Sequence, residues 1–180
     1  GAFYHVTCRG NQRQPVFLSD ADREAFLFSL QESLRIYGVL LHAYVLMDNH
    51  LHLLVETPRA NLSEFMRRLT VTYTGYFNRN NRRIGHLFQG RYKALLVDRD
   101  SYLIGVARYI HCNPVRTAEW EGRPVSERLR FLVGYRWSSL PGYLERRREE
   151  PWLTIDAVLG ALGDNRERAR RRYARDLERE

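Results

Sequence analysis

The sequence is poor in residues that often reveal a protein's chemistry or compartment. Its 180 residues include two cysteines, Cys8 and Cys112, whose spacing matches no zinc-binding pattern. We interpret them as buried thiols in a reducing compartment. Lys93 is the only lysine, so almost every basic side chain is an arginine. There is no glycine-rich loop of the kind that cradles nucleotide phosphates, and we expect no nucleotide cofactor.

The chain also lacks an apolar run long enough to span a membrane, and no charged-then-apolar leader is visible. Hydrophobic residues make up 44%, enough for a core without disulfide or metal support, and the length predicts one domain. The 29 Lys and Arg against 21 Asp and Glu give a formal net charge of +8. This excess favours a polyanionic partner, although genome bias toward arginine or a need for solubility would give the same composition.

Hydrophobic periodicity predicts a βαββαβ order followed by a helix, without internal repeats. This is the α+β, ferredoxin-like arrangement, an antiparallel sheet with helices packed on it. The predicted strands are Ala2–Arg9, Val39–Met47, His50–Glu56 and Leu87–Val97. The predicted helices are one between Ser19 and Gly38, one from Asn61 to about Phe77, and one over Asp98–Cys112 with Leu103, Val106 and Ile110 facing inward.

Local signals set the ends of these elements. Ser19 is the expected N-cap of the first helix, and Gly38 lies where a C-cap glycine belongs. Asn61 and Glu64 resemble a capping box at the start of the second helix. Pro114 disfavours helix at the residue before it and so ends the third helix.

The C-terminal part gives weaker signals. We divide the chain into a domain at 1–140 and a helical C-terminal extension at 141–180, and expect Arg136–Ser139 to anchor the extension to the main body. Asp164–Glu180 is interpreted as a helix rich in arginine and glutamate, and we expect Arg166–Arg172 to be a solvated helix and not a reader of DNA. The segment Asn78–Gly85 is polar and basic, and we expect it to be a mobile loop.

His50 and His52 are two residues apart on a predicted strand, so both side chains project from one face. Leu51, Leu53 and Val55 occupy the opposite face and fix the register of the strand against the core. Two imidazoles fixed side by side can bind one cation. Histidines on strands are also commonly packed or solvated, so the spacing alone leaves both interpretations open.

Tyr109 and Asn113 lie four residues apart at the end of the third helix and share a face. A helical tyrosine is most often a core or rim residue, as Tyr102 one heptad earlier would be, and Asn113 before Pro114 is also a plausible helix stop. The pair alone therefore does not define a site.

The combination of motifs is more specific than its parts. In chain order they are Tyr4-His5-Val6-Thr7, His50-Leu51-His52, Phe88-Gln89-Gly90-Arg91-Tyr92-Lys93, Tyr109-Ile110-His111-Cys112-Asn113-Pro114-Val115-Arg116 and Trp137-Ser138-Ser139. Over residues 2–140 this set resembles the single-tyrosine HUH transposase superfamily. Within it the chain is most similar to the REP-associated tyrosine transposases, which act on palindromic repeats in bacterial chromosomes.

The resemblance implies a metal-dependent endonuclease and strand transferase, with the HUH nuclease core as its fold. His50, His52 and Asn113 would bind a divalent ion, Mg²⁺ or Mn²⁺, and Tyr109 would be the nucleophile that forms a 5′-phosphotyrosine link. Asparagine at position 113 favours the repeat-associated branch, since the insertion-sequence branch tends to have glutamine there. The repeat-associated branch also implies a monomer, whereas a dimer would fit the other branch.

The implied partner is single-stranded DNA with a hairpin, in the cytoplasm of a bacterium at the nucleoid. The candidates to bind DNA backbone or hairpin bases are Arg9, Asn11, Arg79, Arg82, Arg83, Arg91 and Lys93. Tyr73, Tyr76 and Tyr92 could stack on unpaired bases or serve in packing.

Two alternatives share parts of this pattern. A domesticated protein could recognise repeats without cutting them, but the retained Tyr109, His50 and His52 argue against it. A plasmid replication initiator or relaxase would share the HUH core, but usually carries its tyrosine in another context.

Overall fold

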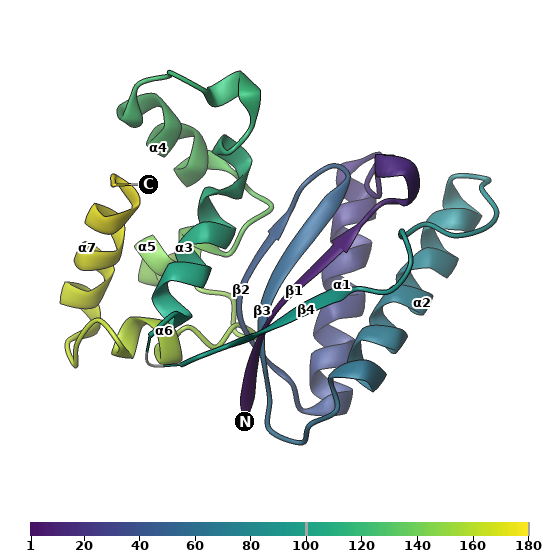
Figure 1. Ribbon diagram of the computed structural model, residues 1–180, viewed down its shortest axis with the longest axis horizontal. Coiled ribbons are helices and arrows are strands. Elements are labelled where there is room, and N and C mark those ends of the chain that lie inside the picture. Colours follow the sequence, from purple (N-terminus) through teal and green to yellow (C-terminus); the bar gives the residue numbers. More distant parts are fainter. Residues whose placement is uncertain (100, 180) are drawn as a thin grey trace.

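The computed structural model describes residues 1–99 and 101–179, with the backbone alone for residue 147. Four strands form an antiparallel sheet in the order β2-β3-β1-β4 (Figure 1). They are β1 (Ala2–Arg9), β2 (Leu40–Leu46), β3 (His50–Thr57) and β4 (Lys93–Val97). Helix α1 (Asp20–Tyr37) joins β1 to β2, and α2 (Leu62–Asn80) lies between β3 and β4. The predicted ferredoxin-like α+β order is therefore confirmed.

Both faces of the sheet are covered, by different parts of the chain (Figure 1). Helices α1 and α2 pack on one face, where Leu51 and Leu53 of β3 are fully buried. Helix α3 (Leu103–Cys112) and the C-terminal helices pack on the other, against Val45 and Leu54. Successive strand residues point to opposite faces, so β3 supplies apolar side chains to both cores.

The C-terminal part belongs to the second core. It contains α4 (Val125–Gly134), α5 (Leu140–Leu144), α6 (Asp156–Gly160) and α7 (Arg166–Leu177). Along the described chain, short 3₁₀ turns occur at Asn11–Arg13, Asn113–Val115, Ala118–Trp120 and Arg146–Arg148. Tyr143, Val158 and Tyr173 are fully buried in the cluster that also holds Leu103 and Ile110 of α3. The 141–180 extension thus shares a core with the sheet, and a boundary at residue 140 stays a prediction.

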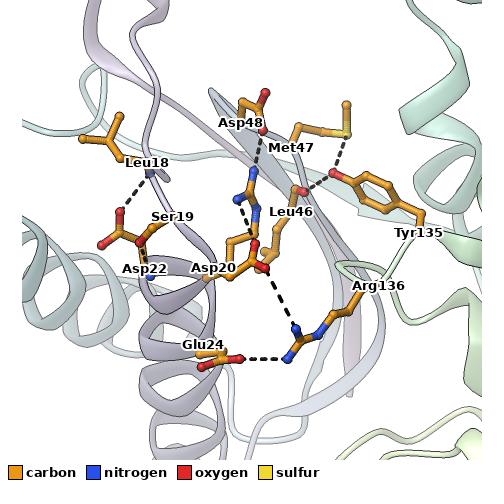
Figure 2. A network of polar contacts seen from close by, with 11 residues as sticks. Leu18, Ser19, Asp20, Asp22, Glu24, Leu46, Met47, Asp48, Tyr135 and Arg136 are labelled. Atoms are coloured by element: carbon orange, nitrogen blue, oxygen red, sulfur yellow. Dashed lines mark hydrogen bonds and ion pairs between the residues drawn. The ribbon is translucent and has the colours of Figure 1, made fainter.

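A short segment before α5 ties this part to the sheet and to α1, as predicted for Arg136–Ser139. Figure 2 shows the Tyr135 hydroxyl donating to the Leu46 carbonyl at 2.7 Å and the Arg136 guanidinium donating to Glu24 of α1 at 2.8 Å. The backbone N–H of Ser139 donates to a β2 carbonyl at 3.0 Å. These contacts extend the edge of the sheet beyond β2 and hold the C-terminal helices in place.

The predicted ends of α1 are confirmed, and α2 begins after Asn61 as predicted, but the predicted capping box is wrong. Ser19 Oγ accepts from the Asp22 N–H at 3.2 Å, and Gly38 closes α1 with a positive φ of 62°. Asn61 does not cap α2 through its side chain. Its amide instead donates to the Tyr37 carbonyl at the end of α1, at 2.8 Å, so this residue joins two helices. A tertiary partner has displaced the local capping interaction.

Strand β4 and helix α3 begin several residues later than predicted, and α2 ends later than predicted. The β4 ladder begins at Lys93 because Gly90 has a φ of 63° and turns the chain, leaving one bridge between Gly10 and Phe88 upstream. Helix α3 begins at Leu103, after a turn in which Asp98 accepts from the backbone of residue 101 at 2.8 Å.

Within α3, Leu103 and Ile110 face the core as predicted. Val106 is only half-buried, and Ala107 takes the buried position in its place. Helix α2 continues to Asn80, so the first part of the predicted 78–85 loop is helical. Across the described residues, no helix combines the length and apolar character needed to cross a bilayer.

Candidate functional site

The histidine pair lies on the sheet face that α3 covers. The rings of His50 and His52 are perpendicular, with centroids 5.2 Å apart, while Leu51 between them is buried in the opposite core. The predicted sharing of one face is confirmed. In the antiparallel register His50 lies opposite Arg9, and His52 lies opposite Thr7. The pair is therefore fixed at the centre of a sheet.

Asn113 brings the end of α3 to this pair. It begins the 3₁₀ turn that follows the helix, and only 8% of its surface is exposed. Its amide lies between the two rings, with Oδ1 3.0 Å from His50 Nε2 and Nδ2 3.2 Å from His52 Nε2. The structure thus brings together the three residues that the sequence proposed as metal ligands.

His52 is held from its other side by β1. Its Nδ1 lies 2.9 Å from His5 Nε2 and 3.1 Å from Thr7 Oγ1. Burial lowers the pKa of His52 to about 3, with further lowering by the neighbouring His5, His50 and Arg9. The ring is therefore neutral at pH 7. With the Asn113 amide donating to Nε2, the single ring proton resides on Nδ1 and is donated toward β1.

His50 faces an unfavourable contact in the absence of a cation. The Asn49 side-chain nitrogen donates to the Arg13 carbonyl at 3.2 Å, so the Asn49 oxygen faces His50 Nδ1 at 2.7 Å and accepts its proton. Burial lowers the pKa of His50, which favours the neutral ring. Its Nε2 lone pair then points at the Asn113 oxygen, 3.0 Å away. In this orientation of the Asn113 amide two acceptors face each other, and a cation bound between them would remove their repulsion.

This donor set fits a divalent cation. Neighbouring ligands of an octahedral magnesium ion, each at about 2.1 Å, lie about 3 Å apart, close to the separation of His50 Nε2 and Asn113 Oδ1. The described residues contain no group of three or more His, Cys, Asp or Glu side chains that could hold a metal. Two imidazoles and an amide oxygen are a sparser set, with room for water and substrate oxygens.

Tyr109 lies beside the histidines and reaches solvent. Its ring centroid is 5.6 Å from that of His5 and 5.7 Å from that of His52, in edge-on contacts. The side chain is 37% exposed, and the Arg116 guanidinium lies 4.8 Å from its ring centre. Tyr102, at the N-cap of α3, is 66% exposed and lies about 10 Å away along the helix. Of these two tyrosines, Tyr109 is therefore the one whose ring lies beside the histidines.

A buried polar network fixes the end of α3 that carries these residues. His111 has no exposed surface; its Nδ1 is 2.6 Å from the Tyr173 hydroxyl of α7 and its Nε2 is 2.7 Å from Ser139 Oγ. Sequence reasoning missed this role. The sequence could have indicated that His111 is buried, because it lies four residues after Ala107 and so on the same face of the helix.

His5 and Thr7 were quoted in a motif but not predicted to contact the site. The sequence feature that could have indicated this contact is the one that His50 and His52 show: two polar residues lie two positions apart on a strand and so share a face. The contact also depends on the register between β1 and β3, which local sequence does not encode.

The predicted DNA contacts divide into two groups. Arg9 lies opposite His50 and Lys93 opposite Thr7, so both flank the site on its own sheet face. Arg9 and Arg91 also line a groove of about 710 Å³ between α2 and residues 86–94, together with Arg67 and Tyr92. The basic surface therefore continues from the site around the exposed strand β4.

The second group lies at the end of α2 and in the segment that follows it. It comprises Arg79 in the last turn of α2, Arg82 and Arg83 just after the helix, and Asn11, which lines a cavity with Arg83. Asn11 and Arg83 line a small cavity of about 70 Å³, and the Arg83 guanidinium lies 5.9 Å from the Phe77 ring centre. These residues do not contact the histidine pair.

The three tyrosines proposed for base stacking have different environments. Tyr73 is fully buried and donates to the Val16 carbonyl at 2.6 Å, so of the two alternatives it serves in packing. Tyr76 is half-buried and stacks on Tyr73. Tyr92 is half-buried in the wall of the groove, where a base could reach it.

Comparison with known proteins gives the family. Residues 1–113 match the IS200-like transposases. The chain belongs to this family. Its fold resembles that of a REP-associated tyrosine transposase bound to a REP hairpin, with a TM-score of 0.64 and 16% identity over 87% of this chain and 84% of that chain. A candidate transposase from Deinococcus radiodurans R1 is 22% identical, with a TM-score of 0.46 over 60% of this chain and 87% of that chain.

A comparison with curated proteins found no match. Membership of the family supports a function in DNA transposition for this chain. The similarity to the REP-associated structure is a similarity of fold.

Proposed function

We propose that this transposase is a metal-dependent nuclease and strand transferase that cuts single-stranded DNA at hairpin repeats. The observation that carries the proposal is the convergence of three ligand-type groups beside an exposed tyrosine. Asn113 lies within 3.2 Å of both His50 Nε2 and His52 Nε2, and the Tyr109 ring lies 5.7 Å from His52.

His50, His52 and Asn113 would hold the divalent ion, with Mg²⁺ or Mn²⁺ suited to two nitrogens, one oxygen and added water. When bound, the ion would neutralise the charge of the phosphodiester and the charge that develops during attack. His5 and Thr7 would hold His52 in the tautomer whose Nε2 is free to bind.

Tyr109 would supply the nucleophile. Its oxygen forms a bond to phosphorus while the bond from phosphorus to the departing 3′-oxygen breaks, giving a 5′-phosphotyrosine and a free 3′-hydroxyl. The phenol proton is lost and a proton is gained by the leaving oxygen, so the step is balanced without another reactant. Because the free energy of the phosphodiester is retained in the link, the 3′-hydroxyl of another strand can reverse the step. A phenol attacks weakly at neutral pH, which makes its fixed position important.

The proposed substrate follows from charge and shape. The relative of similar fold was bound to a REP hairpin. In this chain Arg9 and Lys93 flank the histidines, and the groove with Arg67 and Tyr92 offers cations together with an aromatic surface. This combination suits unpaired bases and their backbone.

We also propose that one protomer carries out cleavage. Tyr109 and both histidines of the site belong to the same chain, so the ligand set and the nucleophile are complete without a partner. Mixing Tyr109→Phe with the doubly substituted His50→Ala/His52→Ala protein tests this. We expect no recovery of cleavage, whereas recovery would show that the tyrosine acts in the site of a second protomer.

The function itself is tested with a labelled single-stranded hairpin and manganese, analysed on a denaturing gel. We expect a protein-linked product from the wild type and from Tyr102→Phe, and none from Tyr109→Phe. A repeat-binding protein that does not cut would bind the hairpin and give no adduct with any variant. An adduct with Tyr109→Phe, or one that the paired His50→Ala/His52→Ala variant still forms at the wild-type rate, would contradict the assignment.

A further inference from the structure

Helix α7 has two faces with different environments, and its inner face is held firmly. Ala169, Arg170, Tyr173 and Leu177 are buried there. The Tyr173 hydroxyl lies 2.6 Å from His111 Nδ1 of α3, and Arg170 pairs with Glu149. Helix α7 is thus fixed relative to α3, at the side of the molecule opposite α1 and α2 (Figure 1).

The outer face of α7 carries arginines at helical spacing and no apolar or aromatic side chain larger than alanine. They are Arg168, Arg171, Arg172 and Arg175, here called the arginine stripe. All four are exposed, and with Ala174 they line a shallow hollow of about 580 Å³. Positions 168 to 175 span about 10 Å along a helix axis. Four like charges within this length repel one another unless an anion lies over them.

The acidic residues of α7 form ion pairs with arginines outside the arginine stripe. Glu167 lies 3.9 Å from Arg170, and Asp176 lies 3.8 Å from Arg108 of α3. Arg166, at the start of the helix, pairs with carboxylates outside it. By contrast, no ion pair of the arginine stripe occurs among residues 1–99 and 101–179. Arg172 donates to the Leu162 carbonyl at 2.6 Å, which leaves its charge uncompensated.

We propose that the arginine stripe binds the phosphate backbone of double-stranded DNA, at a surface separate from the site that holds the single strand. Duplex DNA carries about one negative charge per 1.7 Å of axis, so several phosphates match the length of the stripe. Arginine binds phosphate through two parallel hydrogen bonds. The stripe has no aromatic side chain to stack on a base, and no apolar side chain to enter a lipid layer. Its binding is therefore expected to depend on charge and not on sequence.

This inference goes beyond the proposed cleavage and does not depend on it. Asp176 pairs with Arg108, the residue before Tyr109, so a duplex on α7 would be held at a fixed position relative to the end of α3. The stripe would then retain the paired DNA that flanks a cut single strand.

The test compares two variants of the full chain that lose the same charge. Arg168→Gln/Arg171→Gln/Arg175→Gln removes three stripe arginines and keeps good helix formers. Arg35→Gln/Arg59→Gln/Arg68→Gln removes three exposed arginines on the α1 and α2 side. Affinity for a labelled blunt duplex of about 20 base pairs is measured by fluorescence anisotropy between about 50 and 200 mM salt. Circular dichroism checks that each variant is folded.

We expect the stripe variant to bind the duplex at least about tenfold more weakly, and its salt dependence to be shallower by about 3 in logarithmic slope. The control variant should change either quantity much less, and adduct formation on a short hairpin without a flanking duplex should stay at the wild-type rate for both. Unchanged duplex affinity in the stripe variant, or an equal loss in the control, would overturn the inference. A wild type that forms no adduct would instead contradict the proposed cleavage. The comparison of duplex affinities would still test the arginine stripe in that case.

Discussion

Replacing His111 tests whether the buried network beneath α3 positions the nucleophile. The imidazole has no exposed surface and lies 2.6 Å from the Tyr173 hydroxyl and 2.7 Å from Ser139 Oγ. His111→Leu keeps a similar volume but removes both hydrogen bonds. A buried polar group left without a partner costs about 1–3 kcal/mol. Ser139 Oγ keeps its contacts to Tyr44, so we expect a loss of about 2–4 kcal/mol in the free energy of unfolding.

Urea unfolding and thermal melting measure this loss. For a chain of this size, each kcal/mol lowers Tm by about 2–4 °C, so His111→Leu should melt roughly 4–16 °C below the wild type. Because Tyr109 and Asn113 flank position 111, the adduct rate at saturating DNA should fall at temperatures where the variant is folded. The affinity for the hairpin should change little, because none of the arginines near the groove contacts this network.

A double-mutant cycle with Tyr173→Phe isolates the hydrogen bond between α3 and α7. Tyr173→Phe alone removes the hydroxyl and leaves His111 one partner, so it should cost less than His111→Leu. The two changes share one bond, so together they should cost at least about 1 kcal/mol less than the sum of the single effects. Additive effects, or an adduct rate that stays at the wild-type value in folded His111→Leu, would refute the reasoning.

Three further predictions address the metal, the pH dependence and the DNA. Asn113→Ala should weaken Mn²⁺ binding by roughly 10- to 100-fold in calorimetry without loss of fold, and unchanged affinity would remove Asn113 from the ligand set. Burial lowers the pKa of His42, which Glu56 and Arg99 face, so protonation favours the unfolded chain and stability falls as pH drops below about 6.5. Urea midpoints at pH 7.5 and 5.5 should therefore differ less in His42→Gln than in the wild type, and an unaltered difference would contradict this. Arg91→Gln should lower the salt slope of hairpin binding by about 1 and weaken binding to all sequences alike, whereas a sequence-dependent loss would indicate base contact.

The parts of this protein that sequence predicted well depend on local geometry. The shared face of His50 and His52 follows from the two-residue repeat of a strand, and the ends of α1 follow from the preferences of Ser19 and Gly38. These features need no knowledge of the rest of the chain. The same kind of argument favours packing for Tyr73, because it lies four residues from both Leu69 and Phe77 on α2.

The parts that sequence did not predict depend on contacts between distant segments. Asn61 has a residue type that favours N-capping, but its side-chain amide donates a hydrogen bond to the Tyr37 carbonyl instead. The strand predicted from Leu87 is interrupted because Gly90 adopts a positive φ, a conformation that a glycine permits but does not require. The unfavourable pairing of His50 with Asn113 depends on the side-chain orientation of Asn49, which a contact across the turn determines.

The position of the candidate site depends on chain that lies outside the family match. That match ends at Asn113, yet the sheet face beside the histidines is covered by residues that follow it. Without the C-terminal helices, His111 would lose its Tyr173 partner, and Val45, Leu54 and the inner face of α3 would meet water. The end of α3 carries both the nucleophile and the amide that lies between the histidines, so a small shift there would separate them. The C-terminal helices therefore support the geometry of the site, because they fix one of its two walls while the sheet fixes the other.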